Sequence, residues 1–190
     1  MDFLYFGIER SVMMRNMKKH FSLMFVLFLF VSLLAVTAAA QDYNIIVGGV
    51  QVTDENKSDI FGDGKVSYDS DTNTLTLDNA SVSSSFEIAN NSSGQATTAV
   101  LYSTQELNIL VKGACAFLSD AKESYNDYTI YCELPNLSYG DDHPDFTIRG
   151  YDENSTLIVS SADTKNETSA IYTMRADVVV ENMKSLHCFY

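Results

Sequence analysis

Residues 101–113 read Leu-Tyr-Ser-Thr-Gln-Glu-Leu-Asn-Ile-Leu-Val-Lys-Gly, and residues 171–182 read Ile-Tyr-Thr-Met-Arg-Ala-Asp-Val-Val-Val-Glu-Asn. Both segments open with an aliphatic residue, a tyrosine and a hydroxyl residue, and both continue through a polar link into an alternating apolar run. The alternation places Ile109 and Val111 on one face of the first segment, and Val178 and Val180 on one face of the second. Such self-similarity is typical of repeat architectures, in which a unit buries its apolar face by stacking on its neighbours. We interpret the two segments as successive copies in a stack.

The chain after residue 40 reads as short strands separated by polar turns. Gly48-Gly49 and Asp63-Gly64 are typical of hairpin turns, because the central positions of such turns favour a positive φ. No convincing amphipathic helix lies between the strand patterns, which disfavours a doubly wound α/β fold with crossover helices. Two all-β architectures remain, an antiparallel sandwich and a solenoid. The self-similarity favours the solenoid, with the opening hairpins as a capping element.

The first 40 residues have the pattern of a secretory signal peptide. Lys18 and Lys19 precede an apolar run at residues 21–36, and small residues at 38–40 provide a cleavage site. Met17 opens this pattern so naturally that it is an alternative start of translation. An uncleaved membrane anchor is the less favoured alternative, because the run is shorter than the ~20 residues that span a bilayer. We therefore expect an exported protein without a membrane span after signal cleavage.

The chain is acidic, with 25 Asp and Glu against 12 Lys and Arg and a net charge of −13. This balance excludes nucleic acid as an expected partner, because phosphates are bound by basic residues that displace counterions. Anionic membrane surfaces are disfavoured for the same reason. The charge fits solubility, divalent cations or neutral sugars.

Several segments resemble a known family of secreted bacterial repeat proteins. The opening segments Val47–Thr53, Gly64–Asp69 and Asn73–Ala80 resemble the opening module of these proteins, and the later segments Phe146–Gly150, Thr156–Val159 and Ala170–Thr173 resemble their rungs. The family is similar to carbohydrate-binding β-helix domains related in shape to polysaccharide lyases. The resemblance implies an all-β, right-handed parallel β-helix with an N-terminal β-hairpin capping module at 41–95 and rungs at 96–190. It also implies a bacterial protein, secreted, periplasmic or on the cell surface, that binds polysaccharide with calcium on the solenoid.

Tyrosines are the candidate sugar-binding residues, because the chain has no Trp and 11 Tyr. Tyr102 and Tyr172 occupy equivalent positions of the two similar segments, so we expect them in one ladder on a flank of the stack. Such a ladder serves either ligand binding or packing between neighbouring strands. Both interpretations stay open from the sequence.

An acidic loop is the candidate metal site. Asp141, Asp142 and Asp145 lie around His143, and oxygen ligands of this kind favour calcium. A zinc site would need more His or Cys at ligand spacing. The alternative is a solvated acidic loop.

Three cysteines allow one disulfide and leave one thiol. Cys115 and Cys132 are the nearest pair in sequence, while Cys188 is left over. The apolar neighbours of Cys115 are equally consistent with a small buried hydrophobic residue.

No catalytic residue is predicted, because the sequence contains no nucleophile elbow, zinc motif or phosphate-binding loop. The favoured function is a secreted, non-enzymatic carbohydrate-binding or cell-surface module of unknown ligand. The alternatives are a fragment of a polysaccharide lyase or glycoside hydrolase, and a structural adhesin repeat. We also expect an open C-terminal end of the stack, covered by further rungs of a longer protein or by another chain.

Overall fold

The computed structural model describes residues 41–90, 93–121, 124–134, 145–162 and 164–189. Within these ranges the chain forms fifteen β-strands and no helix, which confirms the predicted all-β class. The predicted signal peptide at 1–40 lies outside the described residues. The described part of the chain also contains no helix with the length and hydrophobicity needed to cross a bilayer.

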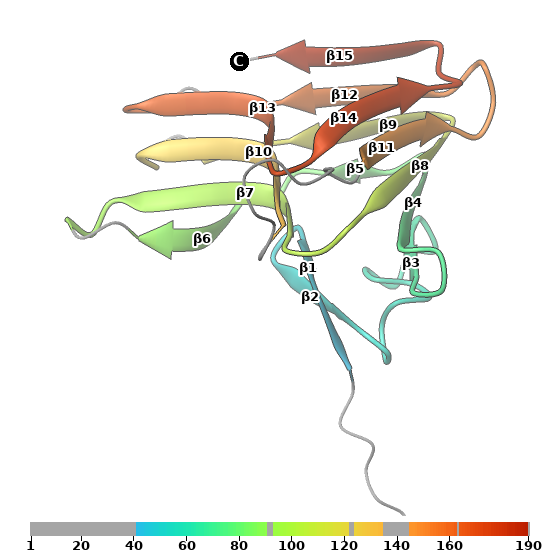
Figure 1. The fold of residues 1–190 in the computed structure, drawn as a ribbon, viewed down its shortest axis with the longest axis horizontal. Helices are drawn as coiled ribbons and strands as arrows, with labels where there is room; N and C mark the ends of the chain where they lie inside the picture. Colours follow the sequence, from blue (N-terminus) through green and yellow to red (C-terminus); the bar gives the residue numbers. More distant parts are fainter. Residues whose placement is uncertain (1–40, 91–92, 122–123, 135–144, 163, 190) are drawn as a thin grey trace, which may run out of the picture. The chain divides into compact units, whose positions relative to one another are not determined.

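The strands are short and separated by turns (Figure 1). In chain order they are β1 (Asp42–Val47), β2 (Val50–Thr53), β3 (Val66–Asp69), β4 (Thr74–Asp78), β5 (Ser81–Val82), β6 (Phe86–Asn90), β7 (Ala96–Ser103), β8 (Asn108–Lys112), β9 (Ala114–Leu118), β10 (Asn126–Glu133), β11 (Asp145–Gly150), β12 (Thr156–Ser160), β13 (Glu167–Met174), β14 (Asp177–Glu181) and β15 (Ser185–Phe189).

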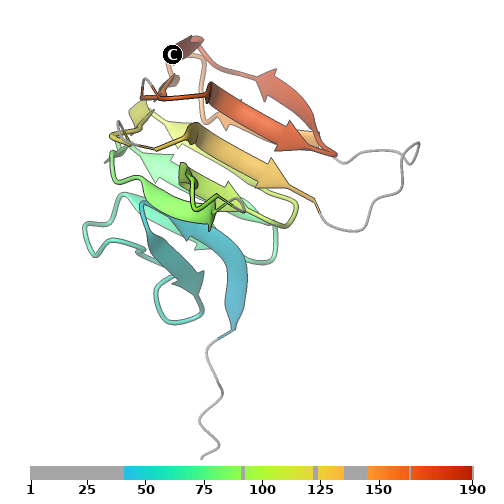
Figure 2. The ribbon, with the colours of Figure 1, turned by 90° about the vertical axis from the view of Figure 1, so that its left-hand side faces the viewer.

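The strands assemble into three sheets. Sheet A has the order β13-β10-β7-β1-β2, with β6 on β7; sheet B has the order β14-β11-β8-β4-β3; and sheet C has the order β15-β12-β9-β5. From β7 to β12, each strand pairs in parallel with the strand three places later in the chain. Figure 2 shows these strands lying above one another in sequence order. Residues far apart in the sequence, such as Tyr102 and Tyr131, are therefore neighbours across a sheet.

We expected the two similar sequence segments to be successive strands of their sheet, and they are not. β7 and β13 are separated by β10, so Tyr102 pairs with Tyr131, and Tyr131 pairs with Tyr172. The register in sheet B also differs from the alignment of the sequences, since Ile109 lies in register with Ile148, and Ile148 with Val180 rather than Val178. A shift of two residues keeps the same face of a strand inward, so the hydrophobic alternation alone does not reveal it.

A β-hairpin lies beside the first of these strands. β1 and β2 pair in antiparallel fashion across Gly48-Gly49, which confirms the predicted turn. Both glycines have a positive φ, of 55° and 79°. Glycine adopts this conformation without the steric cost that a Cβ atom would add. Because β1 also pairs antiparallel with β7, the hairpin covers the edge of β7.

The predicted hairpin turn at Asp63-Gly64 is wrong. β3 pairs forward with β4, in register from Val66↔Leu77 to Asp69↔Thr74, and not back with β2. The preceding segment is instead a loop held by its own contacts: the Asp59 carboxylate accepts a hydrogen bond from the Gly64 N–H at 3.0 Å, and Ile60 is buried. Local turn chemistry at Gly64 is therefore present, but its strands find other partners.

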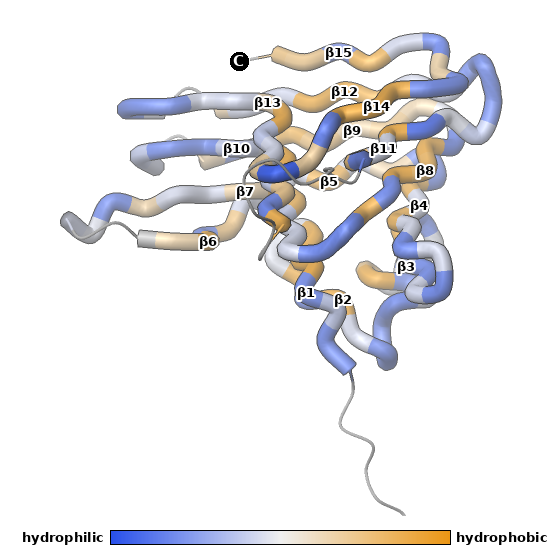
Figure 3. Tube along the Cα trace, viewed as in Figure 1, coloured by the Kyte–Doolittle hydropathy of each residue, from blue (hydrophilic) through white to orange (hydrophobic). Residues whose placement is uncertain are grey.

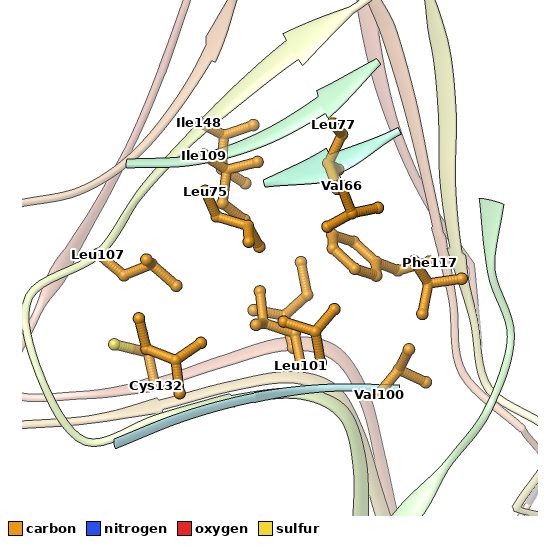
Figure 4. Packing of buried hydrophobic residues seen from close by; sticks show 14 of the residues in the cluster. Val66, Leu75, Leu77, Val100, Leu101, Leu107, Ile109, Phe117, Cys132 and Ile148 are labelled. Atoms are coloured by element: carbon orange, nitrogen blue, oxygen red, sulfur yellow. The ribbon is translucent and has the colours of Figure 1, made fainter. Parts of the chain in front are cut away.

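The core consists of inward side chains that lie above one another between the sheets. Leu75, Ile109 and Ile148 follow each other across β4, β8 and β11, and each is at most 1 % exposed. Figure 4 shows them together with further members of this cluster. Complete burial of such a side chain stabilises the fold by about 1.5–3 kcal/mol. In Figure 3 the hydrophilic colour gathers at the tips of β10 and β13, away from this interior.

The last strands of the sheets leave part of this apolar interior open. Val178 and Val180 on β14 are the register partners of Phe146 and Ile148, which are buried. The two valines nevertheless remain 43 % and 46 % exposed. Their side chains occupy core positions, but no described strand lies on their outer side.

One buried carboxylate crosslinks neighbouring strands. Asp127 on β10 is fully buried; its Oδ1 accepts hydrogen bonds from Thr98 Oγ1 at 2.9 Å and from Ser119 Oγ at 2.8 Å. Its Oδ2 accepts the Ala162 N–H at 3.0 Å. Burial raises the pKa of this carboxyl above its ordinary value. Buried polar groups of this kind are stable because every oxygen has a donor.

All three cysteines are free. Cys115 and Cys132 are buried, and the thiol of Cys115 donates toward the Leu77 and Lys112 carbonyl oxygens at 3.6 and 3.4 Å. Cys115 thus fills the core as a small hydrophobic residue, the second of the two interpretations drawn from its neighbours. Cys188 is exposed.

Candidate functional site

A ladder of three tyrosines runs across the outer face of sheet A. Tyr102, Tyr131 and Tyr172 stand in register on β7, β10 and β13. The ring centroids of Tyr102 and Tyr131 are 5.6 Å apart, and those of Tyr131 and Tyr172 are 5.0 Å apart with an angle of 20° between the ring planes. The two aliphatic neighbours Leu101 and Ile130 face the core. The period of two along a strand therefore places the tyrosines on the opposite side.

A fourth tyrosine completes the cluster. The Tyr128 ring lies 5.4 Å from that of Tyr131 and 4.7 Å from that of Tyr172. Its strand neighbours in register are Ala99 and Ser169, whose small side chains leave room for the ring. Tyr128 is 7 % exposed, whereas the three tyrosines of the ladder are half-buried. Tyr128 thus supports the ladder, and the other three rings remain within reach of a ligand.

Two glutamates accept hydrogen bonds from these phenols. Tyr131 Oη donates to Glu133 Oε2 at 3.2 Å, and Tyr128 Oη donates to Glu167 Oε2 at 2.8 Å. Burial is the largest cause, and the nearby glutamate the next, of a pKa far above the ordinary value of a phenol at both Tyr128 and Tyr131. Burial and Glu133 also raise the pKa of Tyr102. These phenols therefore remain protonated, as neutral hydrogen-bond donors, through the physiological range of pH.

A polar row lies beside the aromatic one. Asn126 Nδ2 donates to Thr97 Oγ1 at 3.3 Å, and Asn166 Nδ2 donates to Asn126 Oδ1 at 2.8 Å. These three side chains lie near the starts of β7, β10 and β13, in the same order as the tyrosines. The row provides amide and hydroxyl groups that act both as donors and as acceptors.

These side chains surround a surface hollow of about 210 Å³, which we call the tyrosine hollow. Its lining residues are Ile88, Ala89, Thr97, Tyr102, Asn126, Tyr128, Tyr131, Glu133 and Tyr172. The first two belong to β6, the antiparallel neighbour of β7, which forms one wall. The hollow combines aromatic rings, a carboxylate, an amide and a hydroxyl, which is the mixture expected of a site for a small polar ligand.

The structure brings the two predicted tyrosines, Tyr102 and Tyr172, into this one hollow. Sequence reasoning counted Tyr128 and Tyr131 among the available tyrosines but did not place them in the ladder, where Tyr131 joins Tyr102 to Tyr172. A signal for Tyr131 existed in the triplet Ile130-Tyr131-Cys132, which matches the aliphatic–tyrosine–hydroxyl pattern except at its last position. Glu133 and Glu167 carried no sequence signal, since their proximity to the phenols arises from strand pairing.

Only one of the three predicted metal ligands lies in the part of the chain that the structure describes. Asp141 and Asp142 lie outside the described residues, and Asp145 is exposed at the start of β11. Within the part of the chain that the structure describes, no group of three or more His, Cys, Asp or Glu side chains has the geometry to hold a metal ion. The calcium site therefore stays a prediction.

Comparison of the chain with protein-family models, with curated proteins and with solved structures gives no match. The resemblance to bacterial β-helix proteins thus also stays a prediction.

Proposed function

We propose that this protein is an exported carbohydrate-binding module, built as a right-handed parallel β-helix, whose ligand occupies the tyrosine hollow. The β-helix is supported by the parallel pairing of each strand from β7 to β12 with the strand three places later, in three separate sheets. The hairpin of β1 and β2 at the edge of β7 supports the proposed capping module. Export is supported by the signal-peptide pattern of residues 1–40.

The observation that carries this function is the outward, half-buried tyrosine ladder, which lies beside the Glu133 carboxylate and the Asn126 amide. Sugars present both apolar C–H faces and hydroxyl groups, which require aromatic surfaces and hydrogen-bonding side chains together. The rings of Tyr131 and Tyr172 stack on each other, and the exposed parts of the three half-buried ladder rings supply the aromatic surface. Glu133 and Asn126 then supply the acceptor and donor groups that sugar hydroxyls need.

The open end of the stack supports a second element of the proposal. Val178 and Val180 occupy core positions but remain exposed. We propose that further rungs of a longer protein, or another chain, cover them. The tyrosine hollow is formed by β6, β7, β10 and β13. Because β13 is the edge strand of sheet A, Tyr172 lies at the same open end of the stack.

Binding to an array of plant and bacterial glycans, followed by calorimetry on the positive ligands, tests the proposed function. Tyr131→Ala and Tyr172→Ala should each weaken binding by tenfold or more, as expected for an aromatic residue at the centre of a binding site. Tyr151→Ala is the matched control, because Tyr151 is 66 % exposed, contacts Lys112 and lies outside the hollow.

The same experiment separates the alternatives. Release of reducing ends or of unsaturated products from the bound glycans would indicate the lyase or hydrolase fragment. Absence of binding across the array, with and without calcium, would refute the proposed function and favour a structural adhesin repeat, in which the tyrosines serve packing alone.

A further inference from the structure

We infer that the tyrosine hollow selects uncharged sugars over uronic acids, and that Glu133 and Glu167 set this selectivity. The inference rests on the carbohydrate-binding function proposed above and names the class of ligand. It differs from what the shape of a polysaccharide-lyase-like fold alone would imply, since such enzymes act on uronates.

The charge of the tyrosine hollow is negative. Among its described lining residues, Glu133 carries a charge and no Lys or Arg is present. Glu167, the acceptor of the Tyr128 hydroxyl, adds a second carboxylate beside the cluster. Proteins that recognise carboxylates use Arg or Lys, whose N–H groups pair with the two oxygens. The tyrosine hollow lacks this element and carries the opposite sign.

The phenol donors of two tyrosines are already engaged by carboxylates. The carboxylates of Glu133 and Glu167 hold the phenol hydrogens of Tyr131 and Tyr128, so these donors already point at a carboxylate. An incoming uronate would compete with a fixed carboxylate for the same donors and would lie close to a like charge. Like charges at short range in a partly desolvated site repel strongly.

A neutral sugar meets no such conflict. Each hydroxyl group donates one hydrogen bond and accepts others, so it can donate to Glu133 while it accepts from Asn126. A hydrogen bond from a neutral group to a carboxylate is stronger than one between two neutral groups. The same glutamate therefore favours a neutral sugar and opposes an acidic one.

A second surface hollow provides a contrast. On sheet B a hollow of about 250 Å³ is lined by Arg149 and Glu181, together with hydroxyl and amide side chains such as Thr74, Asn108 and Thr147. This hollow carries charges of both signs. If a uronate pairs with a cationic side chain of this protein, its binding should depend on Arg149 and not on the tyrosines.

Competition calorimetry with neutral and uronic-acid oligosaccharides of equal length tests the inference. The wild-type protein should bind the better neutral oligosaccharide at least about tenfold more tightly than its uronate counterpart. Glu133→Gln combined with Glu167→Gln should reduce this ratio to below about threefold, because it removes the repulsion and retains an acceptor. Glu153→Gln is the matched control for Glu133→Gln, because Glu153 is exposed and lines neither hollow, so the change removes one negative charge away from both.

Each outcome bears on a different statement. Equal or tighter binding of the uronate to the wild type would overturn the inference but leave carbohydrate binding intact, and loss of that uronate binding in Arg149→Gln would locate it on sheet B. A ratio that changes equally in Glu153→Gln and Glu133→Gln would also overturn the inference, because net charge rather than the tyrosine hollow would then set selectivity. Binding of neither class would refute the proposed function itself. The folded state of every variant is checked by its circular dichroism spectrum and its unfolding midpoint.

Discussion

The uncovered end of the stack makes a quantitative prediction about two valines. Val111 on β8 and Val180 on β14 both point toward the interior, but Val111 is 0 % exposed and Val180 is 46 % exposed. Truncation to Ala removes the same atoms at both sites. For Val111→Ala the lost burial of about 0.8 kcal/mol per methylene-sized group, together with the cavity left behind, gives a loss of about 2–3 kcal/mol.

For Val180→Ala the expected loss of stability is smaller. About half of the side chain is already exposed to solvent, so less burial is lost, and the vacated space opens to water instead of forming a closed cavity. We expect a decrease of less than about 1 kcal/mol in the free energy of unfolding. Urea denaturation followed by circular dichroism measures both values, provided that the slope of the unfolding free energy against urea concentration is the same in both variants.

The comparison between the two valines is decisive because their chemistry is identical. Equal losses of 2 kcal/mol or more at both sites, with an unfolding midpoint that does not depend on protein concentration, would refute the reasoning. A midpoint that rises with protein concentration would instead indicate that a second chain covers Val180, as one of the two covers proposed above.

Three further predictions concern the carboxylate, the cap and the site. Burial raises the folded-state pKa of Asp127, so the stability contributed by its protonated form is present at low pH and is lost as the pH rises above the ordinary pKa of the carboxyl. The stability of wild type relative to Asp127→Asn should therefore fall as the pH is raised, and a difference in urea midpoints that does not change with pH would contradict this. Gly48→Ala should lower the free energy of unfolding by about 1 kcal/mol or more, because φ is 55° and an added Cβ would lie 3.0 Å from Val82 Cγ1; an unchanged thermal midpoint would argue against this turn. Tyr128→Phe should retain the ring contacts but lose the hydrogen bond to Glu167, so sugar affinity should change less than in Tyr131→Ala; the reverse order in calorimetry would place the ligand at Tyr128.

The sequence contains enough information to predict an all-β chain and the turn at Gly48-Gly49, because these depend on local alternation and local φ preferences. It also places Tyr102 and Tyr172 at equivalent positions. The hairpin expected at Asp63-Gly64 does not form, because a turn motif does not determine which strand pairs with which. β3 pairs with β4 instead of β2, and contacts of Ile60 and Asp59 hold the loop before β3.

The candidate site is harder to predict for the same reason. Tyr131 lies between Tyr102 and Tyr172 because β10 pairs with both β7 and β13, and the spacing of these strands along the chain is uneven. Cys132 replaces the hydroxyl residue that marks the other two copies, which hides the middle one. The contacts of Glu133 and Glu167 with the phenols depend on side-chain positions across neighbouring strands, which no local pattern specifies.

NMR mapping of the backbone amides during titration with a neutral oligosaccharide shows whether a neutral sugar binds in the tyrosine hollow. We expect the largest chemical-shift changes on residues 97–102, 126–133 and 167–172, with small changes at Arg149 on sheet B and at Ile158 on sheet C. Saturable changes centred on sheet B or sheet C, with the three tyrosine-bearing segments unaffected, would contradict it.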